Sequence, residues 1–127
     1  MRRSLTGVRW SLVSAAALGA SGLAGVLIPD DVGGALELRP TTPRGRAEVR
    51  AGLGGTFAAL GAWALADRSP AASRAVAATW LGAGVVRLWS LTTDRPRTDA
   101  AFWSYLAIEL GLGSLALRDA NAVAAHG

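Results

Sequence analysis

Two ionisable residues interrupt long apolar stretches, and they are the first candidates for chemistry. Arg87 lies within GVVRLWS and Glu109 within AIELGLG. If these stretches cross a bilayer, each charge costs about 2.5–3.5 kcal/mol near the bilayer centre, so such residues persist when they pair, line a cavity or function. By helical rise, Arg87 lies about one turn from the end of its stretch, and Glu109 about two turns into the next. The spacing therefore predicts a salt bridge between adjacent antiparallel helices.

Helical spacing brings further polar and aromatic side chains to the same level as this pair. We expect a polar pocket with aromatic edges that binds a small hydrophobic molecule or a lipid headgroup. Arg87 would hold a polar or anionic group, and Glu109 would orient it. The predicted ligand-binding residues are Arg87, Glu109, Glu48, Arg50, Asp94, Ser90, Tyr105, Trp80 and Trp89.

The same residues also have a structural interpretation. A buried Arg–Glu network can fix the register of packed helices, and the chain would then be a structural or accessory membrane subunit. A proton relay is a further alternative. An isomerase-like enzyme is disfavoured, because one carboxylate beside an arginine does not supply both an acid and a base. We therefore predict no catalytic residue.

Composition excludes several classes of protein. Hydrophobic residues make up 51% of the 127-residue chain and charged residues 17%, against about a quarter in soluble domains. There is no cysteine, and the single histidine is His126, so we expect no metal site and no cofactor. The net charge is +4, but the arginines flank apolar blocks, which disfavours a nucleic-acid partner. All basic residues are arginine, a composition typical of a GC-rich bacterial genome.

The apolar residues form four blocks, which predict an all-α fold: an antiparallel bundle of four transmembrane helices in a single domain, 1–127. Pro29, Asp30 and Asp31 stop the first block. Ser69 and Pro70 start the third, and Thr98 and Asp99 start the fourth. GALEL is expected to form a short surface helix in the long loop, and the second helix to begin near Arg46. The predicted spans are 10–28, 47–66, 70–91 and 99–117, with the long loop at 29–46.

Charges around the first block suggest an orientation. Arg2, Arg3 and Arg9 precede it and two aspartates follow, so we expect both termini in the cytoplasm of a bacterial cell and the chain in the inner membrane. MRRSL before an Ala/Gly-rich stretch also resembles a signal peptide, and its cleavage would leave three spans. Three further blocks favour retention of the first as a membrane helix.

Small residues at helical spacing predict where the helices pack. Helices in lipid associate by close approach, which glycine and alanine permit. Such packing also suits a homo-oligomer or a partner membrane protein. Four tryptophans near predicted span ends fit an aromatic belt, whereas Trp80 lies midway along its span. The expected packing residues are Ala15, Gly19, Gly22 and Gly25; Gly54, Ala58 and Gly61; and Ala78 and Gly82.

Three segments carry a family resemblance: RAEVRAGLGG (46–55), GVVRLWSLTTD (84–94) and IELGLG (108–113). From about Trp10 to Arg118 the chain resembles an uncharacterised bacterial family of small four-helix membrane proteins, a domain of unknown function, and more distantly the DoxX-like membrane proteins. The resemblance implies the four-helix fold and supports the site, but implies no activity. Arg95 stands where the family has glycine. The matching positions are Glu48, Arg50, Gly54, Gly55, Arg87, Ser90, Asp94 and Glu109.

Overall fold

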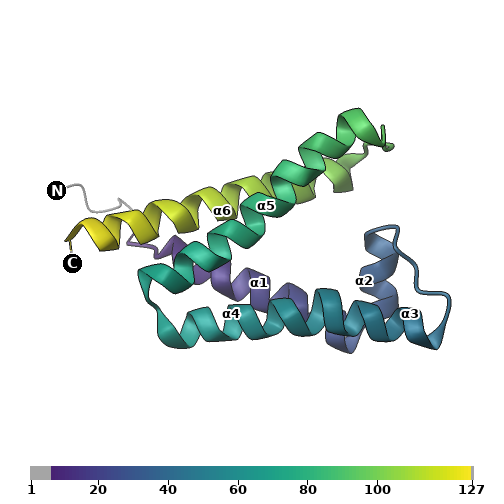
Figure 1. Ribbon diagram of the computed structural model, residues 1–127, viewed down its shortest axis with the longest axis horizontal. Coiled ribbons are helices and arrows are strands. Elements are labelled where there is room, and N and C mark those ends of the chain that lie inside the picture. The colour runs from purple at the N-terminus through teal and green to yellow at the C-terminus, as the bar shows by residue number, and fades with distance from the viewer. Residues whose placement is uncertain (1–6, 127) are drawn as a thin grey trace. The chain divides into compact units, whose positions relative to one another are not determined.

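The described part of the chain, residues 7–126 of a computed structural model, contains helices and no strand. The all-α prediction is therefore confirmed. Residues 1–6, which include Arg2, Arg3 and the MRRSL motif, lie outside the described residues, as does residue 127. Figure 1 shows the elements in chain order: α1 (Trp10–Leu27), α2 (Pro29–Ala35), α3 (Pro43–Glu48), the π-helix η1 (Val49–Gly55), α4 (Thr56–Asp67), α5 (Pro70–Thr93) and α6 (Ala100–His126).

Three described helices, α1, α5 and α6, are long and apolar enough to cross a membrane. The predicted start of α5 is confirmed, because the Ser69 hydroxyl accepts the Ala72 N–H at 3.1 Å and Pro70 follows in the first turn. At the start of α6, the Asp99 carboxylate accepts the Phe102 N–H at 3.0 Å. The helix continues beyond the predicted end at Leu117 as far as His126, because its alanine-rich sequence contains no glycine or proline there.

The predicted second span, 47–66, differs from the structure. It is divided among α3, η1 and α4, and each of these is too short to cross a membrane by itself. The π-helical turns fall on VRAGLGG, where three glycines permit the wider backbone, and the Thr56 hydroxyl donates to the Ala51 carbonyl at 3.1 Å. Helical backbone begins at Pro43, before the expected Arg46, because Thr42 caps it and accepts the Gly45 N–H.

The predicted long loop contains the short helix α2. Pro29, Asp30 and Asp31 follow the end of α1 as expected, but they also begin α2, since proline suits a first turn and carboxylates favour a helix N-terminus. The surface helix expected at GALEL is wrong in position. Leu36 already caps α2, and Glu37 adopts a left-handed backbone with φ of 56°, which ends the helix.

The chain divides into two compact units, each considered by itself. The first unit comprises the described residues 7–14 and 68–126, and α5 and α6 lie antiparallel within it. The beginning of α1 also belongs to this unit. There the Ser11 N–H donates to the Asp119 carboxylate at 2.9 Å, so an acidic side chain satisfies a donor that the first turn of a helix leaves free.

The second unit, residues 15–67, is organised by contacts between small residues of α1 and of η1 and α4. Gly19 faces Gly61, and Gly25 faces Gly54, so the two helical segments run antiparallel. A Cβ placed on Gly22 would lie 2.7 Å from the Gly54 carbonyl oxygen, a distance that leaves no room for any side chain. The predicted packing faces of the first and second blocks are confirmed.

The packing face predicted for the third block is exposed in the described chain. Ala78 and Gly82 are exposed, and a Cβ on Gly82 would meet nothing within 4 Å. α5 instead turns Gly84 toward α6, where a Cβ would lie 2.6 Å from a methyl group of Leu110. Two residues correspond to about 200° around a helix, so Gly82 and Gly84 occupy opposite faces.

The turn after α5 contains a residue other than glycine in the left-handed backbone conformation. Arg95 follows the last-turn residue Asp94 with φ of 49°, in the left-handed region. An L-residue there costs about 1–2 kcal/mol, which explains why glycine is the preferred residue at this position.

Substitutions of glycine test the packing of α1. We expect Gly22→Ala to lower the free energy of unfolding by about 1–3 kcal/mol, because the new methyl group would overlap backbone atoms that cannot rotate away. The measurement is unfolding in mixed micelles as the fraction of denaturing detergent rises. Gly82→Ala is the control and should be neutral or stabilising by up to about 1 kcal/mol. Equal effects of the two changes would contradict this packing.

Candidate functional site

Arg87 and Glu109 form a bidentate ion pair between α5 and α6. Arg87 Nε donates to Glu109 Oε2 at 2.8 Å, and Nη2 donates to Oε1 at 2.6 Å. Two parallel charge-assisted hydrogen bonds fix the guanidinium in orientation as well as in position. The predicted salt bridge between these helices is confirmed.

Two glycines let the helices approach closely enough for this pair. Gly84 lies one turn before Arg87 and contacts the Leu110 side chain, while Gly113 lies one turn after Glu109 and contacts Leu81. A Cβ on Gly113 would come within 2.7 Å of Leu81 Cγ. Leu110 fills the space beside Gly84, and Leu81 fills the space beside Gly113. Packing therefore sets the separation of α5 and α6 at this level.

Aromatic rings flank the guanidinium of Arg87. Its central carbon lies 5.5 Å from the centre of the Phe102 ring and 5.6 Å from that of Tyr105, both within the range of cation–π attraction. Phe102 in turn meets Trp103 edge to face, with ring centres 5.4 Å apart. Phe102 was not among the predicted ligand-binding residues, although the spacing 102, 105, 109 places it on the same helical face.

The pair is unequally exposed. Glu109 is buried, with 9% of its side chain accessible, whereas 25% of the Arg87 side chain is accessible. The two bonds to Glu109 use two of the five N–H groups of a guanidinium. The arginine is therefore the accessible partner, and it has donors beyond those that the carboxylate engages.

The other predicted residues of the first unit lie near the pair in sequence but have different partners. The Ser90 hydroxyl donates to the Arg87 backbone carbonyl at 2.8 Å, and Asp94 ends α5. Trp89 is 62% exposed. Trp80 donates its indole N–H to the Ser14 carbonyl at 3.2 Å, so its polar group serves the packing of α5 against the start of α1.

Glu48 and Arg50 belong to the second unit and have partners there. Glu48 lies 3.7 Å from Arg44, one turn earlier on an exposed helix face. Arg50 donates to the Val26 carbonyl near the end of α1. The last carbonyls of a helix lack partners within it and attract cations, so Arg50 acts as a C-terminal cap for α1.

Metal binding has no support in the described part of the chain. Within residues 7–126, no three acidic, histidine or cysteine side chains gather in a group that could hold a metal ion.

Removal of either partner tests how the pair supports the fold. We expect Arg87→Gln to lower the free energy of unfolding by about 3–5 kcal/mol, because it leaves the buried Glu109 carboxylate without its counter-ion. Glu109→Gln should cost less, since the more exposed arginine can turn toward a polar surface. The double variant should be more stable than Arg87→Gln alone. Detergent unfolding curves measure these differences.

A surface substitution calibrates this experiment. Arg74→Gln removes an exposed arginine from the same helix, where its hydrogen bond to Asn121 is long at 3.4 Å, and it should change stability by no more than about 0.5 kcal/mol. If Arg87→Gln behaved like Arg74→Gln, the ion pair would not hold α5 and α6 together.

Comparison with known proteins places these features in a family. No curated protein and no solved structure matches the chain. The sequence profile described as "Domain of unknown function (DUF4345)" matches residues 9–118, which include both unit cores, the Arg87–Glu109 pair and the Arg50 cap. Since this match covers most of the 127 residues, the chain belongs to the DUF4345 family.

Proposed function

We propose that this protein is a four-span protein of the bacterial inner membrane that binds a small hydrophobic molecule or lipid by its polar head at Arg87. Both termini face the cytoplasm in this proposal. Glu109 holds the guanidinium in place, and Phe102 and Tyr105 restrict its movement. The DoxX-like membrane proteins supply the expected shape, and no catalytic step is assigned.

The unequal exposure of the ion pair is the observation that carries this proposal. A buried carboxylate anchors an accessible arginine whose direction is already fixed, with N–H groups left for an acceptor from outside. Fixing a donor before binding reduces the entropy that binding must otherwise remove. This arrangement suits a phosphate, carboxylate or carbonyl group on the ligand.

Exposed apolar side chains next to Arg87 along α5 suggest that the ligand enters from lipid. Val85, Val86 and Leu88 are all exposed in the described chain, as is Trp89. In water such a surface would be unfavourable, whereas in a bilayer it faces hydrocarbon. A molecule with an apolar body could lie along these residues while its polar end meets Arg87.

A structural or accessory subunit is the second candidate, and the bidentate geometry favours it. Two short hydrogen bonds between adjacent helices fix their register whether or not anything else binds. In that case the remaining donors of Arg87 would meet lipid headgroups or water, or a second protein chain. The two candidates differ in whether a discrete molecule stays bound.

The fourth span of this proposal is the segment from Pro43 to Asp67. Its backbone is helical throughout, since the junction residues Glu48, Val49 and Thr56 are all right-handed helical. No charged residue occurs from Ala51 to Ala66. The segment also contacts α1, itself a candidate span, from Gly19–Gly61 to Gly25–Gly54. This packing alongside α1 supports a fourth span.

Single cysteines test this topology, because the sequence has none. With four spans, a cysteine replacing Thr41 and one replacing Ala66 should react with an impermeant thiol reagent from opposite sides of sealed vesicles. With three spans they should react from the same side. A cysteine replacing Thr98 gives the reference, and it should share the side of residue 41 only in the four-span topology.

Native mass spectrometry of protein released from mild detergent tests binding at Arg87. The wild type should carry a discrete extra mass, and Arg87→Gln should reduce its occupancy at least about tenfold, as expected for loss of a charge-assisted hydrogen bond. Glu109→Gln should reduce it as well, because the guanidinium loses its orientation.

The control for this measurement is Arg118→Gln, an exposed arginine with a long 3.8 Å contact to Asp119. It should keep the extra mass, and circular dichroism should report an unchanged helix content in every variant compared. Folded wild-type protein without any bound mass would count against the binding proposal and leave the structural subunit as the explanation.

A further inference from the structure

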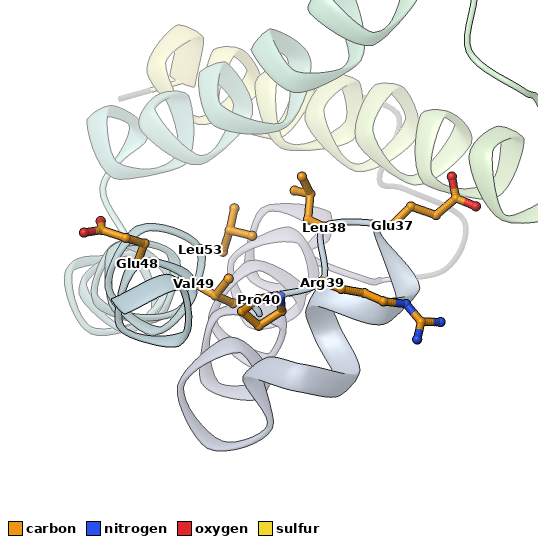
Figure 2. Close-up of a pocket in the computed structure, with 8 residues that line it drawn as sticks. Glu37, Leu38, Arg39, Pro40, Glu48, Val49 and Leu53 are labelled. Carbon is orange, nitrogen blue, oxygen red and sulfur yellow. The ribbon is translucent and has the colours of Figure 1, made fainter. Parts of the chain in front are cut away.

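The second unit contains a pocket away from the residues discussed so far. It lies between the segment after α2 and the start of the α3–η1 helix, and its volume is about 540 Å³. Figure 2 shows Leu38 and Pro40 from the first segment opposite Val49 and Leu53 from η1. Pockets of this size accommodate small molecules or parts of larger ones. The facing side chains are apolar, so the interior suits hydrocarbon.

Charged groups border this apolar interior. Glu48 extends from one side of the pocket, and Glu37 and Arg39 extend from the other (Figure 2). Glu48 has a counter-ion in Arg44. Arg39, by contrast, has no hydrogen-bond or ion-pair partner within residues 7–126. Glu37 also has a partner, so Arg39 is the charged residue of the lining that is available to an anionic ligand.

The neighbouring arginines are already engaged, which makes Arg39 distinct. Arg46 donates to Asp30 at 2.9 Å, and Arg50 caps the end of α1 through the Val26 carbonyl. The first contact ties α3 to α2, and the second ties η1 to the end of α1. Gly54, next to the pocket residue Leu53, packs against Gly25 in the last turns of that helix.

We propose that this pocket binds a phospholipid with an anionic headgroup, with an acyl chain against Leu38, Pro40, Val49 and Leu53 and the phosphate at Arg39. The proposal rests on the proposed function in one respect, because it takes α1 as a membrane span. The end of α1 then lies at the membrane surface, where headgroups and the first methylene groups of lipids meet the protein. An apolar interior with one unpaired cation at its border matches the two ends of such a lipid.

A titration with two lipids of identical acyl chains tests the headgroup. Native mass spectrometry in detergent would follow phosphatidylglycerol and phosphatidylcholine binding to the full chain. The wild type should bind phosphatidylglycerol about fivefold more tightly, the effect of one arginine near an anionic headgroup. Arg39→Gln should bind both lipids equally. Arg95→Gln makes the same charge change outside the pocket and should keep the preference.

A pocket-filling substitution tests the acyl-chain contact. Leu38→Trp places a larger side chain at the 59% exposed Leu38 position and should weaken both lipids at least fivefold. Leu27→Trp, at another exposed leucine of the same unit that does not line the pocket, should weaken neither. If the protein formed a dimer that Leu38→Trp abolished without changing lipid binding, the occupant of the pocket would be a second copy of the chain. That result would overturn the proposal.

The outcome for the pocket can be separated from the outcome for Arg87. Arg87→Gln should leave the phosphatidylglycerol preference unchanged, and Arg39→Gln should leave the ligand of Arg87 in place. Two outcomes would overturn the pocket proposal while the Arg87 site stood. In the first, the wild type binds the two lipids equally. In the second, the preference for phosphatidylglycerol is lost in Arg87→Gln and kept in Arg39→Gln. If the wild type carried no extra mass but kept the lipid preference, the Arg87 site would be overturned and the pocket proposal would stand.

Discussion

Helices in a bilayer gain little from burying apolar side chains, because lipid is as apolar as the protein interior, and they associate where their backbones can approach. This constraint explains where the chain has glycine. Gly22 and Gly25 meet η1 and α4 without room for a Cβ, and Gly84 and Gly113 do the same between α5 and α6. The second unit thus has an antiparallel contact of small residues, whereas in the first unit each glycine receives a leucine side chain of the opposite helix. The polar interactions depend on this spacing, because a guanidinium reaches a carboxylate on the next helix only when the helices are close.

Several charged side chains of this protein pair with one another or satisfy the backbone groups at a helix end. Asp119 accepts an N–H at the start of α1, and Arg50 donates to a carbonyl near its end, so both termini of that helix are satisfied by side chains distant in sequence. Arg87 and Glu109 neutralise each other inside two candidate spans. Few charges remain without an evident structural task, which narrows the search for functional residues in a chain that has 13 arginines.

Features that follow from local rules could be predicted from the sequence. The start of α5 at Ser69 and Pro70, the packing glycines of α1, and the Arg87–Glu109 pair each depend on spacing within one or two helices. The π-helix η1 could not be predicted in this way, because glycines permit wider helical turns without requiring them. Gly82 was assigned to a contact for a related reason. Small residues occur on two faces of α5, and only the position of α6 decides which of them packs.

The arginines can be ordered by how many of their N–H donors the fold uses. Arg46 and Arg50 are committed to a carboxylate and to a helix end. Arg87 is committed through two N–H groups and keeps others, while Arg39 has no partner in the described residues and borders an apolar pocket. A cation that the fold neither neutralises nor uses as a cap still attracts anions, and at a membrane surface the most abundant anions are lipid phosphates. The two binding proposals rest on Arg87, which Glu109 holds in place, and on Arg39, which borders an apolar pocket.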